Sequence, residues 1–158
     1  MKPSVLKQML VRVSMLAVVL LLGACAKLNE GGLWLATSKV DAFLVVNGQL
    51  LTGDAQLVPD RTGRVAFTAG AGAVRSCGGA MRYTASRSGE MDIQCNDGTQ
   101  VTLEFTALSE TKGYGYGTTP QGVASVAFGY SENDAQAFLK VPPGKKLVLG
   151  ADGALTLQ

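Results

Sequence analysis

The sequence predicts an all-β fold: an antiparallel meander of about 8–10 short strands, closed as a small barrel or folded as a sandwich, with one helix at residues 131–140. Two observations predict this class. Short stretches of alternating apolar and polar residues recur along the chain, and turns rich in Gly, Asn and Asp separate them. No helical crossover interrupts the stretches, so consecutive strands are expected to run antiparallel.

The first hairpin is indicated by Asn47-Gly48, which lies between apolar stretches at residues 40–46 and 49–58. Asn-Gly accepts the positive φ angles that a two-residue type I′ turn needs. Residues 59–63 (PDRTG) form the next predicted turn, and a strand follows at residues 64–68. Glycines between residues 70 and 79 then predict an irregular entry into the next strand.

Cys77 and Cys95 are expected to lie nearly opposite each other in one hairpin. Residues 80–85 and 91–95 flank a turn at residues 86–89. A hairpin centred on this turn pairs position 77 with position 95 or 96. Facing residues of an antiparallel ladder are close enough for a disulfide, so the spacing predicts a bond between the two cysteines.

The clearest half-buried strand follows a turn at residues 96–98 and covers residues 99–108, where apolar residues occupy every second position. Residues 112–117 (KGYGYG) are expected to form a Gly-Tyr loop, and residues 123–130 alternate again. Ser131 and Asp134 match a capping box for the helix at residues 131–140, which Pro142 would end. A last hairpin is predicted from residues 146–150 and 154–157.

The N-terminal segment has the parts of an export signal. Lys2, Lys7 and Arg12 supply positive charge, and residues 13–22 are an apolar run. About ten apolar residues are too few to span the roughly 30 Å hydrocarbon core as a helix, so residues 1–24 are interpreted as a signal peptide.

Leu22-Gly23-Ala24-Cys25 resembles the lipobox of bacterial lipoproteins. The resemblance implies cleavage between Ala24 and Cys25, a covalent diacylglycerol on Cys25 and, in most members, acylation of the new amine. Two or more acyl chains give stable attachment, whereas one is marginal. The alternative is an ordinary secretory signal in which Cys25 falls by chance. By similarity to the sorting rule of enteric bacteria, Ala26 in place of Asp favours the outer membrane.

Residues 25–32 are then a lipidated tether and residues 33–158 a single β-rich domain. Removing the signal leaves 11 basic and 12 acidic residues, so the mature chain has no excess of positive charge for nucleic acid.

The chain contains no histidine, which excludes Ser-His-Asp and Cys-His catalysis and imidazole metal ligands. With Cys25 acylated, only Cys77 and Cys95 remain, and an oxidising compartment favours their disulfide. No cofactor, no metal site and no catalytic residue are expected.

Two polar features remain as candidate sites. Tyr114 and Tyr116 of the Gly-Tyr loop offer flat apolar faces and hydroxyls to a partner, or else they pack against the barrel rim. The acidic side chains at positions 90, 92, 97 and 104 are the candidates for an acid–base pair, but their place on a polar strand face favours solvated charge.

A second resemblance covers residues 52–118. The chain is similar there to a β module of small exported bacterial proteins and lipoproteins whose activity is not established. The matching positions are Thr52-Gly53, Cys77, Gly79, Tyr83, Gly89, Cys95-Asn96-Asp97-Gly98 and the Gly-Tyr segment. The resemblance implies a fold and carries no catalytic residues.

The function expected from the sequence is that of an outer-membrane lipoprotein, not an enzyme, whose domain faces the periplasm and contacts an envelope partner. Besides the membrane and that partner, the lipoprotein processing and sorting machinery would act on it. The alternative is a module that binds or inhibits a soluble envelope enzyme or a glycan through the Gly-Tyr loop.

Overall fold

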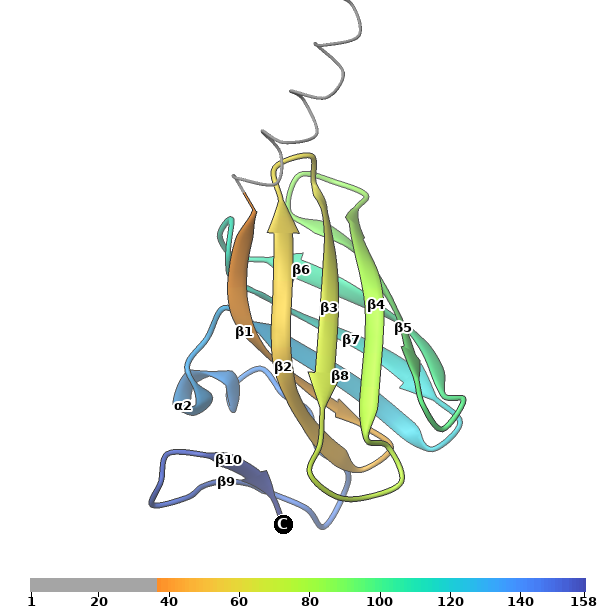
Figure 1. Cartoon of the computed structure of the whole chain (residues 1–158), viewed down its shortest axis with the longest axis vertical. Helices are drawn as coiled ribbons and strands as arrows, with labels where there is room; N and C mark the ends of the chain where they lie inside the picture. The colour runs from red at the N-terminus through yellow and green to blue at the C-terminus, as the bar shows by residue number, and fades with distance from the viewer. Residues whose placement is uncertain (1–36) are drawn as a thin grey trace, which may run out of the picture. The chain divides into compact units, whose positions relative to one another are not determined.

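Eight antiparallel strands close into a barrel in which β1 pairs with β8 and every other pair is consecutive in the sequence (Figure 1). This computed structural model describes residues 37–158. The predicted signal peptide, the Ala24–Cys25 cleavage and lipidation site and the tether lie outside the described residues. The barrel strands are β1 (Ser38–Val46), β2 (Gln49–Val58), β3 (Thr62–Thr68), β4 (Ser76–Tyr83), β5 (Ser88–Cys95), β6 (Gln100–Ala107), β7 (Gly113–Thr119) and β8 (Gly122–Phe128).

The closed barrel confirms the predicted antiparallel meander and decides against the sandwich. The Asn47-Gly48 hairpin is confirmed, because both residues have positive φ angles, of 49° and 71°. Local sequence is sufficient here, since few residue pairs tolerate these angles.

The lumen of the barrel is filled by apolar side chains. Along β3, β5 and β6 every second residue is buried, as expected for strands with one face toward a core. Eight strands enclose a space just wide enough for side chains. Its largest fully buried members are Phe67, Phe105, Phe128, Leu44, Leu51, Met81, Met91 and Leu103.

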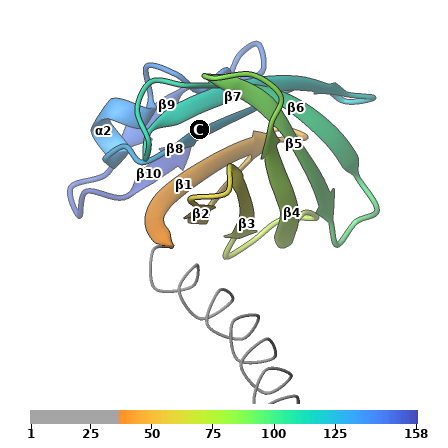
Figure 2. The ribbon, with the colours of Figure 1, turned by 90° about the horizontal axis from the view of Figure 1, so that it is seen from above.

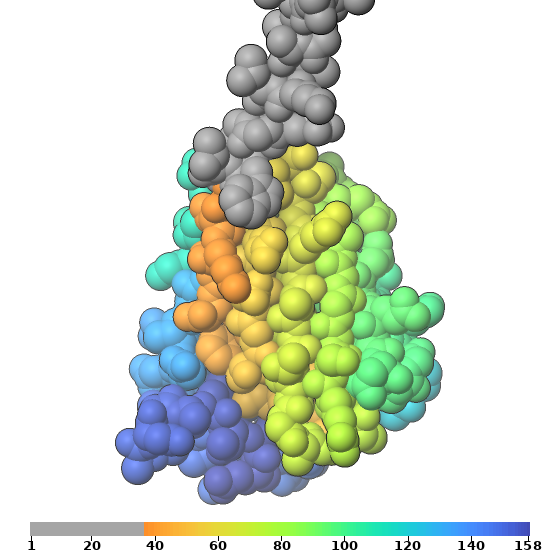
Figure 3. All heavy atoms as spheres, in the orientation of Figure 1, coloured from red at the N-terminus to blue at the C-terminus, as the bar shows by residue number. Residues whose placement is uncertain are grey.

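A second apolar cluster lies outside the barrel, under the C-terminal segment. This segment contains α2 (Glu132–Ala135) and the hairpin of β9 (Leu147–Leu149) and β10 (Leu155–Leu157). Figure 2 shows it beside β1 and β8, and Figure 3 shows the hairpin, in dark blue, near one end of the barrel. The cluster joins Phe43, Val45 and Ala127 of the barrel to Tyr130, Ala135, Leu139 and Leu155.

Strands β1 and β8 are therefore covered on both faces. Residues 42–46 and 124–128 are all buried. The alternation expected for residues 123–130 is wrong on this point, because the C-terminal segment covers the outward side chains as well. A strand buried on both faces gives a continuous apolar run instead of an alternating one.

The helix expected at residues 131–140 is much shorter in the structure. Its start is confirmed: the Ser131 hydroxyl accepts a hydrogen bond from the backbone N–H of Asp134. The helix covers only Glu132–Ala135. The segment leaves the helical path because Lys140 binds the barrel: the buried Ser125 hydroxyl accepts from the Lys140 N–H and donates to its carbonyl, both at 2.9 Å.

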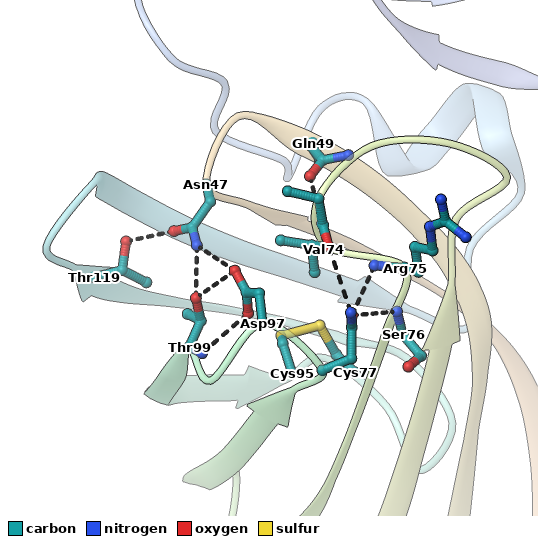
Figure 4. The surroundings of a disulfide bond; sticks show 12 residues. Asn47, Gln49, Val74, Arg75, Ser76, Cys77, Cys95, Asp97, Thr99 and Thr119 are labelled. Carbon is teal, nitrogen blue, oxygen red and sulfur yellow. Dashed lines mark hydrogen bonds between the residues drawn. A yellow bond between two sulfur atoms is a disulfide. The ribbon is translucent and has the colours of Figure 1, made fainter.

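The predicted disulfide is confirmed. Cys77 and Cys95 are directly opposite in the β4–β5 ladder, with 4.0 Å between their Cα atoms. Nearby polar side chains tie together the turns at this end of the barrel (Figure 4). Asn47 donates to Thr99 at 2.7 Å and Gln49 accepts from the Val74 N–H at 2.8 Å, which holds the buried Val74 over the lumen.

Candidate functional site: an outer groove on β5, β6 and β7

Tyr114 and Tyr116 lie in a strand, not in a loop. The Gly-Tyr loop expected at residues 112–117 is wrong, because Gly113–Thr119 is strand β7, paired with β6 on one side and β8 on the other. Gly113 and Gly115 are buried and face the lumen, whereas the two tyrosines alternate with them and face outward.

The inward glycines are required by the close approach of neighbouring backbone and side-chain atoms. A Cβ atom on Gly113 would lie 2.4 Å from Cζ of Phe128, and one on Gly115 would lie 2.8 Å from the Glu104 carbonyl oxygen. Glycine in a strand marks such close approach. The same residue type that suggested a flexible loop therefore fits the tight lumen and sends both tyrosines to the outer surface.

The tyrosines form one wall of an open groove of about 380 Å³ on the outer face of the barrel. The ladder register places its side chains in two rows across three strands. One row is Glu90, Glu104 and Tyr116, and the other is Ser88, Thr106 and Tyr114. The remaining lining residues are Thr84, Gly89 and Phe105.

The tyrosine wall is held by the C-terminal segment. Phe138 stacks on Tyr114 with ring centroids 5.1 Å apart, and its carbonyl accepts a hydrogen bond from the Tyr116 hydroxyl at 2.9 Å. The Lys140 ammonium lies 4.0 Å from the centre of the Tyr116 ring, within range of a cation–π interaction. Burial raises the pKa of Tyr116, and the Tyr114 phenol raises it further. The Tyr116 phenol is therefore a neutral hydroxyl at neutral pH.

The opposite wall carries an ion-paired carboxylate. Arg82 bridges Glu90 at 2.5 Å and Asp92 at 2.7 Å. The pKa of Asp92 is lowered, first by the hydrogen bond from Thr102 and then by Arg82. These groups are exposed, so the pairs contribute little to stability, but they give Glu90 a fixed partner.

Glu104 differs from its neighbours because it has no ion pair or side-chain hydrogen bond within residues 37–158. It lies directly opposite Glu90 on one side and Tyr116 on the other. Like charges that face each other across a ladder are unfavourable. The middle of the groove is therefore an unpaired carboxylate beside a second, paired one.

The groove offers carboxylate, phenol and hydroxyl groups for chemistry or binding. In the part of the chain described by the structure, no three His, Cys, Asp or Glu side chains gather as metal ligands would. None of the helices in that part is both long enough and apolar enough to cross a membrane.

Asp97, the fourth acidic candidate, lies in the β5–β6 turn, where the Thr99 backbone N–H and hydroxyl lower its pKa.

The sequence indicated the tyrosines but missed Glu104 as their neighbour. The strand alternation at residues 99–108 does place Glu104 on the polar face. Its position between Glu90 and Tyr116 depends on two ladder registers, one of which involves a strand that was expected to be a loop.

No protein-family model matches the chain, and no curated protein is similar to it at a significant level. Among solved structures, a protein described as a redesigned beta barrel is similar, with a TM-score of 0.45 and 18% sequence identity. The match covers 61% of this chain and 91% of that one.

Proposed function

We propose that this protein is a bacterial lipoprotein, anchored in the outer membrane through Cys25, whose barrel faces the periplasm and acts as a non-enzymatic module that contacts an envelope protein. The outer groove on β5, β6 and β7 is its contact surface. The observation that carries the proposal is the contrast between the two faces of the barrel. The lumen is filled by side chains, whereas the outer face has a groove with a rigid wall.

A preformed wall favours binding because little conformational freedom is lost when a partner docks. Tyr114 is stacked on Phe138, and Tyr116 is held by its hydrogen bond to the Phe138 carbonyl. Tyrosine is also common in binding surfaces, since its ring buries a large area and its hydroxyl keeps a polar contact.

A non-enzymatic role is supported by the side chains that the groove offers. The chain has no histidine for proton transfer near neutral pH. Glu90 is paired with Arg82, and within residues 37–158 neither Glu90 nor Glu104 hydrogen-bonds to a hydroxyl of the groove that it would have to activate as a base. Binding of a partner protein requires only the shape of the groove and the charges and hydroxyl groups that line it.

The anchor is tested by growing cells with labelled palmitate. The wild-type chain is expected to retain label, and Cys25→Ser is expected to lose it, because the thioether needs the Cys25 sulfur. Cys77→Ser/Cys95→Ser, which keeps Cys25, is the control and should remain labelled. Equal labelling of wild type and Cys25→Ser would refute the anchor.

The contact surface is tested by photo-crosslinking in cells from position 84, at the edge of the groove. We expect capture of a defined envelope protein, and loss of that capture in Thr106→Trp, because an indole on this exposed central position fills the groove. Thr68→Trp is the matched control, since Thr68 is an exposed outward residue of β3, away from the groove. Capture that survives Thr106→Trp would contradict the assignment of the groove.

A further inference from the structure

We propose that the groove receives a cationic side chain, a guanidinium or an ammonium group, from a basic segment of the partner, and that Glu104 is its counter-ion. This inference rests on the proposed function, because it assigns the chemistry of the partner at the same groove. Of the two carboxylates in the groove, Glu104 is the one that has no ion pair or side-chain hydrogen bond within residues 37–158.

Glu104 stands at the centre of a charged row. In the ladder register the row runs from Arg82 through Glu90 and Glu104 to Tyr116. Arg82 neutralises Glu90 from the far side and also binds Asp92, so none of its contacts reaches Glu104. A cation placed over Glu104 would neutralise the second charge of this pair of facing glutamates, which a neutral ligand would not do.

The charges of the residues that line the groove favour a cationic ligand. Its nine lining residues include two glutamates and no lysine or arginine. Of the basic side chains nearby, Arg87 donates to the Leu108 carbonyl at 2.9 Å and Lys140 lies over the Tyr116 ring at 4.0 Å. Lys140 shows, within the molecule, that an ammonium group packs on this tyrosine.

The rest of the lining fits a peptide segment. Thr84, Ser88 and Thr106 bring hydroxyl groups that can bond a peptide backbone, and the tyrosine rings provide apolar contact for the stem of a long side chain. A glycan is less favoured, because one ring face of Tyr114 is occupied by Phe138 and a neutral sugar leaves Glu104 unpaired. A guanidinium group also forms paired hydrogen bonds with a carboxylate, which adds geometric selectivity.

The experiment measures binding of a fluorescent peptide, Gly-Arg-Gly-Arg-Gly, to the full-length lipoprotein in detergent micelles. Saturable binding is expected, weakened about tenfold or more in Glu104→Gln, since a charge-assisted hydrogen bond is lost. Raising the salt concentration from about 50 mM to about 500 mM should also weaken it, because exposed charges are screened. A peptide with norleucine in place of arginine should not bind.

Glu110→Gln is the matched control. It removes the same charge from an exposed residue that has no ion pair or side-chain hydrogen bond within residues 37–158 and does not line the groove. Equal weakening in Glu104→Gln and Glu110→Gln, equal binding of the norleucine peptide, preference for a soluble glycan fragment, or no saturable binding of the arginine peptide would each overturn the inference. The melting temperature of Glu104→Gln should be no lower than that of wild type, which separates lost binding from lost folding.

The same variant in cells separates this inference from the proposed function. If crosslinking from position 84 is lost in both Glu104→Gln and Thr106→Trp, both proposals are supported. If it is lost only in Thr106→Trp, the groove binds a partner without the cation, and only this inference fails. If no variant, including wild type, captures a defined protein, the proposed function itself fails.

Discussion

Loss of the Cys77–Cys95 disulfide is expected to lower the free energy of unfolding by about 3 kcal/mol, the value that chain entropy predicts for a loop of this length. The two cysteines are 18 residues apart and their sulfur atoms lie in the lumen core. Without the bond, the unfolded chain regains the freedom that the closed loop removed. The thermal midpoint of Cys77→Ser/Cys95→Ser should fall by about 10 °C relative to the oxidised wild type.

Reduction provides the internal control for this prediction. Treatment with a reductant should lower the melting temperature of the wild type toward that of the double variant and leave the variant unchanged. Intact mass should rise by about two hydrogen atoms on reduction, which verifies that the bond was present and broken. A wild-type melt that is the same before and after verified reduction would contradict a stabilising role for the disulfide.

Gly79→Ala is expected to be at least as damaging, with a loss of about 3 kcal/mol or a failure to fold. A Cβ atom at this position would lie 2.0 Å from the Asp92 carbonyl oxygen and 3.0 Å from the Ile93 Cα atom, both in the backbone of β5. A strand backbone in a closed barrel cannot move aside as a side chain can, since it is paired on both sides. Chemical denaturation, with the midpoint compared at equal slope, measures the effect.

Gly78→Ala is the matched control, one residue away in the same strand. Its Cβ would point outward, with the nearest atom, the Val65 carbonyl oxygen, at an ordinary 3.6 Å. We expect this variant to match or slightly exceed the wild type, because alanine restricts the unfolded chain more than glycine does. Equal destabilisation by both substitutions would show that strand flexibility, not the contact with β5, explains the effect.

The disulfide and Gly79 both belong to the scaffold that holds the outer groove. Every strand of the closed barrel pairs with two neighbours, which leaves little free strand edge among β1 to β8 for a partner strand. The outward side chains of its central strands remain available. In this chain the groove lies on β5, β6 and β7, and the disulfide joins β4 to β5 at one end of the barrel.

Predictions from the sequence are correct where two or three neighbouring residues determine the backbone conformation. Asn47-Gly48 forms its hairpin because positive φ angles are costly for most other residues. Ser131 begins the helix because its side chain satisfies the Asp134 N–H. The register of Cys77 with Cys95 followed from the centre of one hairpin and the constant sum of paired positions in an antiparallel ladder.

Predictions from the sequence are wrong where contacts between residues far apart in the chain determine the conformation. The helix ends at Ala135 and residues 136–138 continue only as turns, while Phe138 packs on Tyr114 and Lys140 binds Ser125. Residues 113–117 read as a loop because glycine is rare in strands, but the lumen requires glycine opposite Phe128 and Phe105.

The all-β class, the turns and the disulfide pairing follow from the sequence, which also makes Tyr114 and Tyr116 candidates, because each depends on residues close together in the chain or on the alternation of a strand. The closure of the strands into a barrel, the outward direction of both tyrosines on strand β7, and the position of Glu104 between Glu90 and Tyr116 are set by the tertiary structure. These features depend on registers between strands and on the limited space of the lumen, which no local pattern specifies.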